Sequence, residues 1–595
     1  MAKKKNRQKF SCDFETTTKV EDCRVWAYGC MEIGNLENFH WGTDISAFMS
    51  WAERTEADLY FHNLRFDGEF IVNWLLKNGF EHSTEAYPMT FQTIISSMGQ
   101  WYAIDICYGF EGKRKLHTAI YDSLKKIPFP VKQIARDFKL PILKGDIDYH
   151  KERPIGYQLD ENEISYLRND VEIIARALEI QFGQGLEKMT IGSDALNGYK
   201  EIVSKKNFER IFPVFSLEMN EDLRTCYKGG FTWCNPRFQG KVVDRGLVYD
   251  VNSLYPAQMY DRLLPYGQPI FFKGTYKEEP DYPLYIQHVR CGFYLKENHI
   301  PCIQLKGRAA KQLGVNGNDY LDSSKGELVD LYLTNVDLEL IREHYELYEE
   351  TYVDGWMFRG KVGMFKDYID KWMYVKTHEK GAKKLLAKLM LNNLYGKFAT
   401  NPDVTGKVPS LREDGSTAFK LGEEEFKDPV YTPMGAFITA WGRYTTITTA
   451  QKCFDRILYC DTDSIHLLGD TVPEAIADQI DEDRLGYWAH ESTFVKAKFL
   501  RQKTYIEWHE TKPLRYVGGL QNGPKVPAKL KRYNGKVDVK CAGMPERIKE
   551  VVTFTNFEIG FRVETGRLKP AHVSGGVVLV DQPFEIRKSL GFLGR

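Results

Sequence analysis

The chain has 595 residues, 43% of them hydrophobic, which is enough for several domains with buried cores. Its 81 basic and 81 acidic residues cancel, and the absence of a bilayer-length apolar run and of any Cys-x-x-Cys pair excludes membrane-spanning proteins, zinc ribbons and disulfide frameworks. Residues 491–595 nevertheless hold 20 Lys and Arg against 10 Asp and Glu, which fits either a bound polyanion or a merely solvated surface.

The first predicted strand carries two carboxylates. In residues 9–15 the strand period of two places Asp13 and Glu15 on the same face. A second strand-like run, residues 58–61, is followed by Asp67 on what we expect to be a loop. Each of these carboxylates alone would most often be an ordinary surface or capping group.

A helical pattern over residues 163–180 adds Tyr166 and Asp170, which lie four residues apart and therefore on one helical face. Four carboxylates on strand, loop and helix, with a tyrosine one turn before the last, suggest two-metal phosphodiester hydrolysis. In that chemistry one ion activates a water and the other stabilises the leaving 3′ oxygen.

This set resembles the proofreading 3′–5′ exonucleases, which use Asp-x-Glu, Asn-x-x-x-Asp and Tyr-x-x-x-Asp. The resemblance implies that the four carboxylates and Asp146 bind metal, that Tyr166 positions the water, and that Lys144 assists at the scissile phosphate. It also implies which residues hold the single-stranded 3′ end: His62, Asn63, Phe66, Ser123 and Leu124.

A loop at residues 227–230 has the sequence Tyr-Lys-Gly-Gly. Paired glycines permit close approach of the backbone to a ligand, although a plain turn is the better interpretation of this stretch on its own. The stretch resembles the Tyr-x-Gly-Gly motif of family B DNA polymerases. That resemblance implies DNA contacts from Tyr227, Gly229 and Gly230.

Three further carboxylates follow strands. Residues 247–249 are predicted to form a buried strand that ends at Asp250. Residues 457–459 and 465–468 are predicted strands joined by a tight turn that holds Asp461 and Asp463. An Asp-x-Asp pair alone could be a solvated hairpin tip, but the trio can hold two ions roughly 3.5–4 Å apart around a transferring phosphoryl group.

The sequences around these carboxylates, Asp-x-x-Ser-Leu-Tyr-Pro and Tyr-Cys-Asp-Thr-Asp-Ser, resemble the two carboxylate motifs of family B polymerases. The resemblance implies that Tyr255 stacks under the deoxyribose and excludes a 2′-hydroxyl. It also implies that the Val251 backbone contacts a metal. Residues 262–361 separate motifs that must meet in space, so we expect an insertion with short strands.

Residues 385–396 are strongly helical and are expected to end at the glycine. One polar stripe is formed by Lys384, Lys388, Asn392 and Tyr395, which suits an incoming triphosphate or an ordinary solvated helix face. The stretch resembles the Lys-x-x-x-Asn-Ser-x-Tyr-Gly motif, with Asn393 where Ser is usual. By the same resemblance, Lys376 is a further triphosphate-binding residue.

The last predicted elements lead back to the Asp-x-Asp hairpin. Residues 401–427 are expected to be a loop-like second insertion, followed by a helix. Residues 501–505 alternate as in a strand, so Lys503 and Tyr505 are expected to share a face. The resemblance implies that this pair grips the primer terminus, that residues 525–569 line duplex product, and that two residues of the helix contact the template: Thr439 and Arg443.

From residue 11 to about residue 587 the chain resembles the protein-primed family B DNA polymerases of Bacillus phages. The resemblance implies an α/β (α+β) multidomain fold, with an RNase H-like exonuclease before a right-hand polymerase. The expected segments are 1–190 (exonuclease), 191–261 (palm, first part), 262–361 (insertion one), 362–398 (fingers), 399–432 (insertion two), 433–541 (palm, second part) and 542–595 (thumb and tail).

The same resemblance implies the cofactors and partners. We expect two Mg²⁺ or Mn²⁺ ions per active site, with primer-template DNA, single-stranded DNA and dNTPs as ligands. A terminal protein primer would form a heterodimer with the polymerase at initiation, and the enzyme would otherwise be a monomer in the cytoplasm of the infected bacterial host. Strand displacement and processivity are implied by the resemblance alone.

Two other function classes stay open: a nuclease with a degenerate polymerase half, and a non-catalytic DNA-binding scaffold. The complete trio of Asp250, Asp461 and Asp463 argues against the first. A scaffold has no need for seven placed carboxylates, which argues against the second. Dependence of the reaction on dNTPs separates all three classes.

Overall fold

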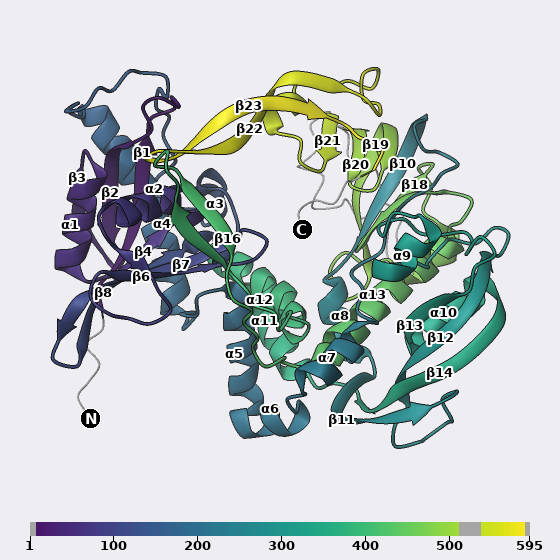
Figure 1. Cartoon of the computed structure of the whole chain (residues 1–595). Helices are drawn as coiled ribbons and strands as arrows, with labels where there is room; N and C mark the ends of the chain where they lie inside the picture. The colour runs from purple at the N-terminus through teal and green to yellow at the C-terminus, as the bar shows by residue number, and fades with distance from the viewer. Residues whose placement is uncertain (1–6, 511–536, 590–595) are drawn as a thin grey trace.

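The computed structural model describes residues 7–510 and 537–589 of the chain. It has an eight-stranded sheet near the N-terminus, a seven-stranded central sheet, a four-stranded sheet and two separate hairpins. Figure 1 shows the N-terminal and central sheets on opposite sides of the molecule, with the yellow C-terminal hairpin extending between them. The predicted α/β multidomain fold is confirmed. Within the described ranges, no helix is long and apolar enough to cross a membrane.

The N-terminal sheet has the strand order β3-β2-β1-β4-β8-β7-β6-β5, so β1 lies inside it. Buried Phe10, Cys12 and Phe14 alternate along β1 and leave Asp13 and Glu15 on the opposite face, as predicted. The strands are β1 (Lys9–Thr16), β2 (Val25–Glu32), β3 (Asn35–Gly42), β4 (Asp58–Phe61), β5 (Glu81–His82), β6 (Thr90–Ile95), β7 (Trp101–Glu111) and β8 (Arg114–Asp122).

Helices cover this sheet, and the longest of them confirms the helix predicted over residues 163–180. This helix begins with a capping box, in which Asp160 and Glu163 each accept a hydrogen bond from the other's backbone N–H. The capping box starts the helix two residues before the predicted start, and the helix also ends three residues after the predicted end. The helices packed on the sheet are α1 (Ile45–Thr55), α2 (Leu64–Lys77) and α4 (Glu161–Gly183).

The central sheet has the order β21-β20-β19-β10-β18-β17-β9, which places β10 between β19 and β18. The predicted buried strand before Asp250 and the predicted hairpin around Asp461 are both present. The elements are β9 (Thr232–Cys234), β10 (Val242–Val251), α8 (Leu254–Asp261), α13 (Thr432–Lys452), β17 (Ile457–Asp461), β18 (Ser464–Leu468), β19 (Trp488–Arg501), β20 (Thr504–His509) and β21 (Val537–Cys541).

Residues 262–361 form a four-stranded sheet of their own, with the order β11-β14-β12-β13. Its strands are longer than the short runs that we predicted, and β14 alone spans 17 residues. The elements of this segment are β11 (Leu264–Lys273), β12 (Leu284–Leu295), α9 (Gly307–Leu313), β13 (Val329–Thr334), α10 (Asn335–His344) and β14 (Tyr345–Lys361).

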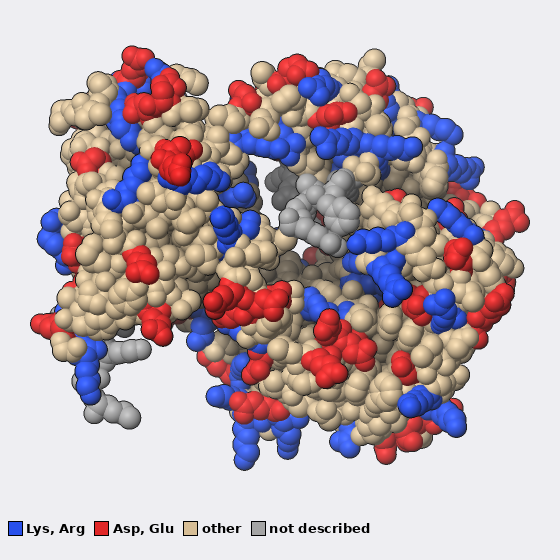
Figure 2. Space-filling view, in the orientation of Figure 1, with Lys and Arg blue, Asp and Glu red and all other residues tan. Residues whose placement is uncertain are grey.

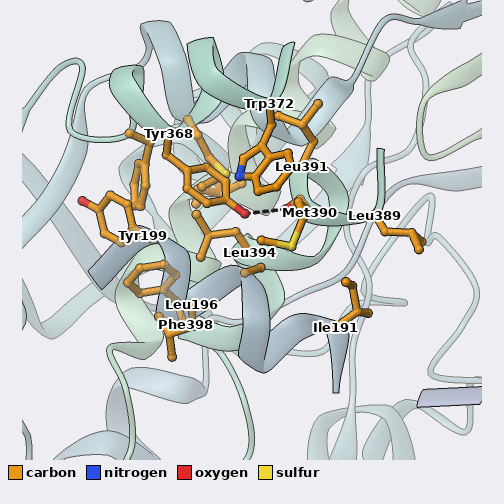
Figure 3. Packing of buried hydrophobic residues seen from close by; sticks show 14 of the residues in the cluster. Ile191, Leu196, Tyr199, Tyr368, Trp372, Leu389, Met390, Leu391, Leu394 and Phe398 are labelled. Atoms are coloured by element: carbon orange, nitrogen blue, oxygen red, sulfur yellow. Dashed lines mark hydrogen bonds between the residues drawn. The ribbon is translucent and has the colours of Figure 1, made fainter. Parts of the chain in front are cut away.

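The predicted polar stripe lies on α12 (Ala382–Phe398), and Lys376 lies on α11 (Lys366–His378). Both helices pack against α5 (Ile191–Val203). In their shared core the Tyr368 hydroxyl donates to the Met390 carbonyl at 2.8 Å. This core fixes the direction in which the opposite, polar side of α12 faces. Figure 3 shows several of the side chains that fill it, including Tyr199, Trp372 and Leu394.

Two boundary predictions in this part of the chain were wrong. α12 passes through Gly396 and ends at Phe398, because fully buried Phe398 extends the apolar side of the helix by a further turn. The expected loop at 401–427 contains a hairpin, β15 (Lys407–Leu411) and β16 (Thr417–Leu421). Short strands with mixed polarity give too weak a periodicity to be recognised.

The C-terminal hairpin, β22 (Arg562–Val573) and β23 (Gly576–Glu585), reaches the N-terminal sheet with its tip (Figure 1). Of the basic segment predicted to line duplex DNA, residues 525–536 lie outside the described residues, as do residues 590–595 of the tail. The remaining helices are α3 (Val131–Asp137), α6 (Lys205–Ile211), α7 (Leu217–Arg224) and α14 (Glu546–Lys549).

Candidate active sites

Four carboxylates meet beside the N-terminal sheet, and we call them the N-terminal carboxylate site. One oxygen of each of Asp13, Glu15 and Asp170 lies within 4.8 Å of the others. Asp67 completes the set, and its Oδ1 atom, like Oδ1 of Asp170, is buried without a hydrogen-bond partner among the described residues. Buried acceptor oxygens that converge without donors are suited to a hard divalent cation.

The electrostatics of this site point to the same ligand. Burial, followed by the charges of Asp13 and Asp170, raises the pKa of Glu15 well above its ordinary value. Burial, followed by Asp13 and Glu15, does the same to the pKa of Asp67. Burial and then Asp170 raise the pKa of Asp13, and the ammonium of Lys144 opposes this only in part. A bound cation would offset the repulsion, so the donor set fits the predicted metal.

Asp67 lies in the first turn of α2 and not on a loop, so this detail of the prediction was wrong. Only two residues lie between the end of β4 and the start of α2, and the second of them, Asn63, makes the tight connection with a left-handed φ of 77°. On the same turn Phe66 packs against Phe70, with ring centroids 5.6 Å apart. The direct passage from strand to helix brings Asp67 toward the carboxylates of β1.

The structure also places the predicted basic residue and tyrosine at this site. Lys144 Nζ donates to Asp170 Oδ2 at 2.6 Å, and the hydroxyls of Tyr166 and Tyr149 are 2.8 Å apart. The sequence did not single out Tyr149, which lies in an irregular segment without periodicity. Asp146 is exposed and is not among the clustered carboxylates, so its role as a metal ligand stays a prediction.

The residues expected to hold a 3′ end are organised by an aspartate that we did not assign. Asp122 Oδ1 accepts from the backbone N–H groups of Asn63 (3.0 Å) and Leu124 (2.9 Å). His62 Nδ1 lies 3.0 Å from Ser123 Oγ, and burial lowers the pKa of His62 to about 4, which keeps the ring neutral. Ser123 is fully buried, so in this structure it orients His62 and does not itself reach the surface.

Three carboxylates of the central sheet form the second cluster, which we call the central carboxylate site. Asp250 of β10 lies opposite Ser464 of β18, and Asp461 of β17 lies opposite the same serine from the other side. The turn between β17 and β18 carries Asp463, whose carbonyl accepts from the Val251 N–H at 2.8 Å. This register brings Asp250 together with two aspartates that lie more than 200 positions later in the sequence.

A basic residue joins this site at the turn between β19 and β20. Lys503 forms an ion pair with Asp461, and its backbone N–H donates to the Tyr459 hydroxyl at 2.8 Å. Lys503 has a left-handed φ of 56°, so the predicted continuous strand is wrong at this position. Tyr505 therefore lies elsewhere and packs against Tyr459, with ring centroids 5.0 Å apart.

A cavity of about 820 Å³ adjoins the central carboxylate site. Asp250 and Asp463 line it, together with three lysines of α11 and α12: Lys376, Lys384 and Lys388. Ammonium groups beside carboxylates provide partners for both a triphosphate and its metal ion. The cavity also takes in the other predicted nucleotide-contacting residues, Tyr255, Asn392 and Tyr395.

Details of the cavity wall explain two features of the sequence. Tyr255 and Tyr395 pack against each other with ring centroids 4.2 Å apart and an angle of 36° between the rings. Asn393, the departure from the motif, donates to the Leu389 carbonyl of its own helix at 2.8 Å and does not line the cavity. The sequence did not indicate two acidic lining residues, Glu482 and Asp483, which lie in a charged loop with no distinguishing pattern.

The loop at residues 227–230 lies against the hairpin of the central carboxylate site. A Cβ atom at Gly230 would lie 2.8 Å from the Thr462 side chain and 3.0 Å from the Tyr255 hydroxyl. Only glycine therefore permits this approach. A Cβ at Gly229 would meet nothing within 4 Å, so that position has open space for a ligand.

Both residues of α13 that were expected to contact the template are buried in the structure, and that role stays a prediction. Arg443 is buried, pairs with Asp337 at 2.8 Å and donates to the carbonyls of Lys228 (2.9 Å) and Gly229 (2.8 Å). Thr439 is also buried and donates to a carbonyl of its own helix at 3.0 Å. Arg443 thus holds the 227–230 loop against α10, and neither side chain reaches the surface in this structure.

Known proteins are similar to this chain along nearly its whole length. A family described as DNA polymerase type B, organellar and viral, matches residues 50–482. The DNA polymerase of Bacillus phage M2 is 61% identical over 582 residues, covering 98% of this chain and 100% of the relative. That of Streptococcus phage Cp-1 is 34% identical, covering 98% and 99%. The solved structure of Phi29 DNA polymerase complexed with primer-template DNA has a TM-score of 0.91 and 59% identity, covering 98% and 100%.

Proposed function

Because this chain belongs to the type B DNA polymerases of the organellar and viral family, we propose that it is a replicative, protein-primed phage polymerase with a proofreading 3′–5′ exonuclease. One observation carries the polymerase part. Asp250 and Asp461 flank a single strand, and the cavity beside them is lined by three lysines. Membership of the family implies divalent metal ions, and the carboxylates of both sites fit them.

At the central carboxylate site the chain's residues orient the primer and the nucleotide. Two Mg²⁺ or Mn²⁺ ions held by Asp250, Asp461 and Asp463 would lower the pKa of the primer 3′-OH and stabilise the charge of the triphosphate. Lys376 and Lys388 line the cavity and would neutralise the triphosphate and the leaving pyrophosphate. Because Lys503 pairs with Asp461, it lies where a primer terminus would arrive.

Sugar selection follows from the packing of Tyr255. Its ring packs against the Tyr395 ring, and a Cβ added at Gly442 would lie only 2.9 Å from it. A ring held on two sides cannot move away from a nucleotide, so it would exclude a 2′-hydroxyl by steric contact. Tyr227, Gly229 and Gly230 would support the adjacent DNA backbone, as the motif resemblance implies.

At the N-terminal carboxylate site the chain would remove a mismatched 3′ nucleotide. The four carboxylates would hold metal ions that activate a water and stabilise the leaving 3′ oxygen. Tyr166 would orient that water, and Lys144 would neutralise charge at the scissile phosphate. The single-stranded end would lie along the surface formed by Asn63, Phe66 and Leu124, which His62 and the buried residues behind it support.

We assign the remaining segments by the same reasoning, with the boundaries given by the sequence. The exonuclease, palm, fingers and thumb would bind primer-template and single-stranded DNA as well as dNTPs. The insertions at 262–361 and 399–432 would contact a terminal protein at initiation and enclose DNA, giving processivity and strand displacement. The enzyme would be a monomer apart from that heterodimer, in the cytoplasm of the infected host.

The test is extension of one primer on a single-stranded circle with Mg²⁺, with and without dNTPs. Products many circle lengths long would support polymerisation and strand displacement together. Products that end at one circle would contradict strand displacement. Primer shortening under both conditions would mean that the nuclease is the main function.

A further inference from the structure

A buried carboxyl group joins two strands of the central sheet that are not neighbours. Glu507 of β20 is 2% exposed, and its two oxygens meet two histidines that are buried to the same degree. Oε1 lies 2.6 Å from Nδ1 of His466, and Oε2 lies 3.3 Å from Nε2 of His509. A carboxylate is costly in such a place unless it is paired, so the histidines are what allows it to stand there.

The contact between Glu507 and His466 reaches across the sheet. In the strand order β21-β20-β19-β10-β18-β17-β9, both β19 and β10 stand between β20, which carries Glu507, and β18, which carries His466. The sheet therefore curves so that side chains of β20 and β18 touch across it. Ring contacts show the same curvature, since Tyr459 of β17 packs against Tyr505 of β20 with centroids 5.0 Å apart.

The alternation of β20 directs the side chains that make these contacts. Tyr505 and Glu507 are two residues apart and share a face, whereas Ile506 is buried on the opposite face in another cluster. The imidazole of His466 meets both side chains of the first face. Its ring lies 5.1 Å from the Tyr505 ring, and its Nδ1 meets Glu507. Two successive positions on one face of β20 are thus held to the hairpin of β17 and β18.

Lys503 stands immediately before this strand, which begins at Thr504. The Lys503 N–H donates to the Tyr459 hydroxyl at 2.8 Å, and its ammonium pairs with Asp461. Tyr459 in turn packs against the His466 ring, with centroids 5.3 Å apart. The left-handed φ of 56° at Lys503 is an uncommon conformation that its neighbours must hold. Any displacement of β20 from the hairpin therefore moves this ammonium.

The pair of Glu507 and His466 cannot itself meet DNA. Figure 2 shows Lys and Arg side chains over the C-terminal hairpin and around the central sheet, where they can meet phosphates. Glu507 and His466 lie beneath that surface, and neither lines the nucleotide cavity. They can act on a substrate only through the residues that they hold in place.

We propose that Glu507 and His466 are positioning residues, which hold Lys503 beside Asp461 and thereby fix the primer terminus at the central carboxylate site. The inference rests on the proposed polymerase function, in which Lys503 meets the primer terminus. A hydrogen bond fixes distance and direction between β20 and the hairpin, whereas an apolar contact would only fill the space. Loss of the pair should therefore weaken primer binding and leave nucleotide binding intact.

The experiment measures the Kd for primer-template by fluorescence anisotropy, without dNTPs or divalent metal, so that the primer is neither extended nor digested. Glu507→Leu removes the hydrogen bond at similar volume, and we expect Kd to rise about tenfold. Glu507→Gln keeps a hydrogen-bonding group within reach of His466, and we expect its Kd within about twofold of wild type. Ile506→Ala is the matched control, because it weakens the opposite face of the same strand. It should lower Tm and keep Kd within about twofold.

A second measurement tests whether the pair acts through Lys503. In a Lys503→Ala background, Glu507→Leu should raise Kd by less than about a further twofold, because the residue that it positions is already gone. KM for dNTP in Glu507→Leu should stay within about twofold at saturating DNA. Where Glu507→Leu does not fold, Glu507→Asp takes its place, since it keeps the charge and shortens the reach.

Three results would overturn the proposal. One is wild-type primer affinity in a folded Glu507→Leu enzyme, and another is an undiminished effect of that change in the Lys503→Ala background. The third is a rise in Kd in Ile506→Ala or Glu507→Gln as large as in Glu507→Leu, because strand stability or charge alone would then explain it. Failure of the wild-type enzyme to extend any primer would instead contradict the proposed polymerase function, whereas the affinity comparison does not depend on turnover.

Discussion

The two carboxylate sites differ in how completely the fold builds them. At the N-terminal site three carboxylate oxygens lie within 4.8 Å of one another, and burial with mutual repulsion raises the pKa values of the group. At the central site Asp250 and Asp463 line an open cavity, and Lys503 pairs with Asp461. The first site is prepared for a cation by the protein alone, whereas the second needs its substrates to become complete.

Asp461→Asn should disable the central carboxylate site and leave the N-terminal carboxylate site intact. We expect primer extension to fall by about 10⁴-fold, because the central site loses both a metal ligand and the partner of Lys503. Excision of single-stranded DNA should be unchanged, since the two sites share no side chains. Both rates are measured on the same preparation. Extension near the wild-type rate would remove Asp461 from the metal site.

The double variant Asp13→Ala with Asp67→Ala should disable the N-terminal carboxylate site and leave the central carboxylate site intact. We expect 3′–5′ digestion to fall by about 10³-fold, because two of four ligands of the N-terminal site are lost, while extension persists. Digestion of a labelled single strand without dNTPs is the measurement. Undiminished digestion would place the nuclease elsewhere in the chain.

Lys388→Ala tests whether the nucleotide completes the central carboxylate site. We expect kcat/KM for dNTP to fall by about 30-fold, which corresponds to about 2 kcal/mol for one charge-assisted contact with the triphosphate. Lys383→Ala is the matched control, because Lys383 is an exposed lysine of the same helix that does not line the cavity. An equal loss in both variants would argue against a specific contact.

His490 allows a pH test of the sheet beneath the central site. Burial lowers its pKa to about 4 from an ordinary 6.5, so the unfolded chain binds the proton first on acidification. The contribution of His490 to stability is therefore complete above pH 6.5 and is lost as the pH falls toward 4. Between pH 7 and 5 we expect the wild-type free energy of unfolding to lose about 2 kcal/mol more than that of His490→Gln. Parallel pH profiles of the two proteins in denaturant titrations would contradict this.

Asn393→Ser, which restores the usual motif, should have the smallest effect. Because the Asn393 side chain bonds its own helix outside the cavity, we expect less than about a twofold change in kcat/KM for dNTP. Steady-state kinetics with one dNTP varied provides the comparison. A larger change would show that this position shapes the nucleotide site indirectly.

The sequence predicted those parts that depend on local pattern. Strand alternation placed Asp13 beside Glu15, and helical spacing placed Tyr166 one turn from Asp170. The strands that carry Asp461 were also evident, because short apolar runs flank a turn sequence. Period and turn chemistry are written into neighbouring residues, so they can be read without knowing the rest of the fold.

The sequence did not reveal what depends on long-range packing. Nothing near Arg443 indicates that it is buried against Asp337, 106 positions away. The turn at Lys503 was missed because a single left-handed residue interrupts an otherwise regular alternation. Asp122 lacked a role until the structure showed the two backbone N–H groups that it accepts. Such features follow from the tertiary contacts and from no local pattern.

Binding of Mn²⁺, followed by its paramagnetic resonance signal in solution, tests the contrast between the two sites most directly. We expect the protein without DNA to bind Mn²⁺ at the N-terminal site, and the Asp13→Ala, Asp67→Ala variant to lose that binding. Further binding should require primer-template and dNTP together and should be lost in Asp461→Asn. Binding without DNA that survives the double variant but disappears in Asp461→Asn would contradict the account.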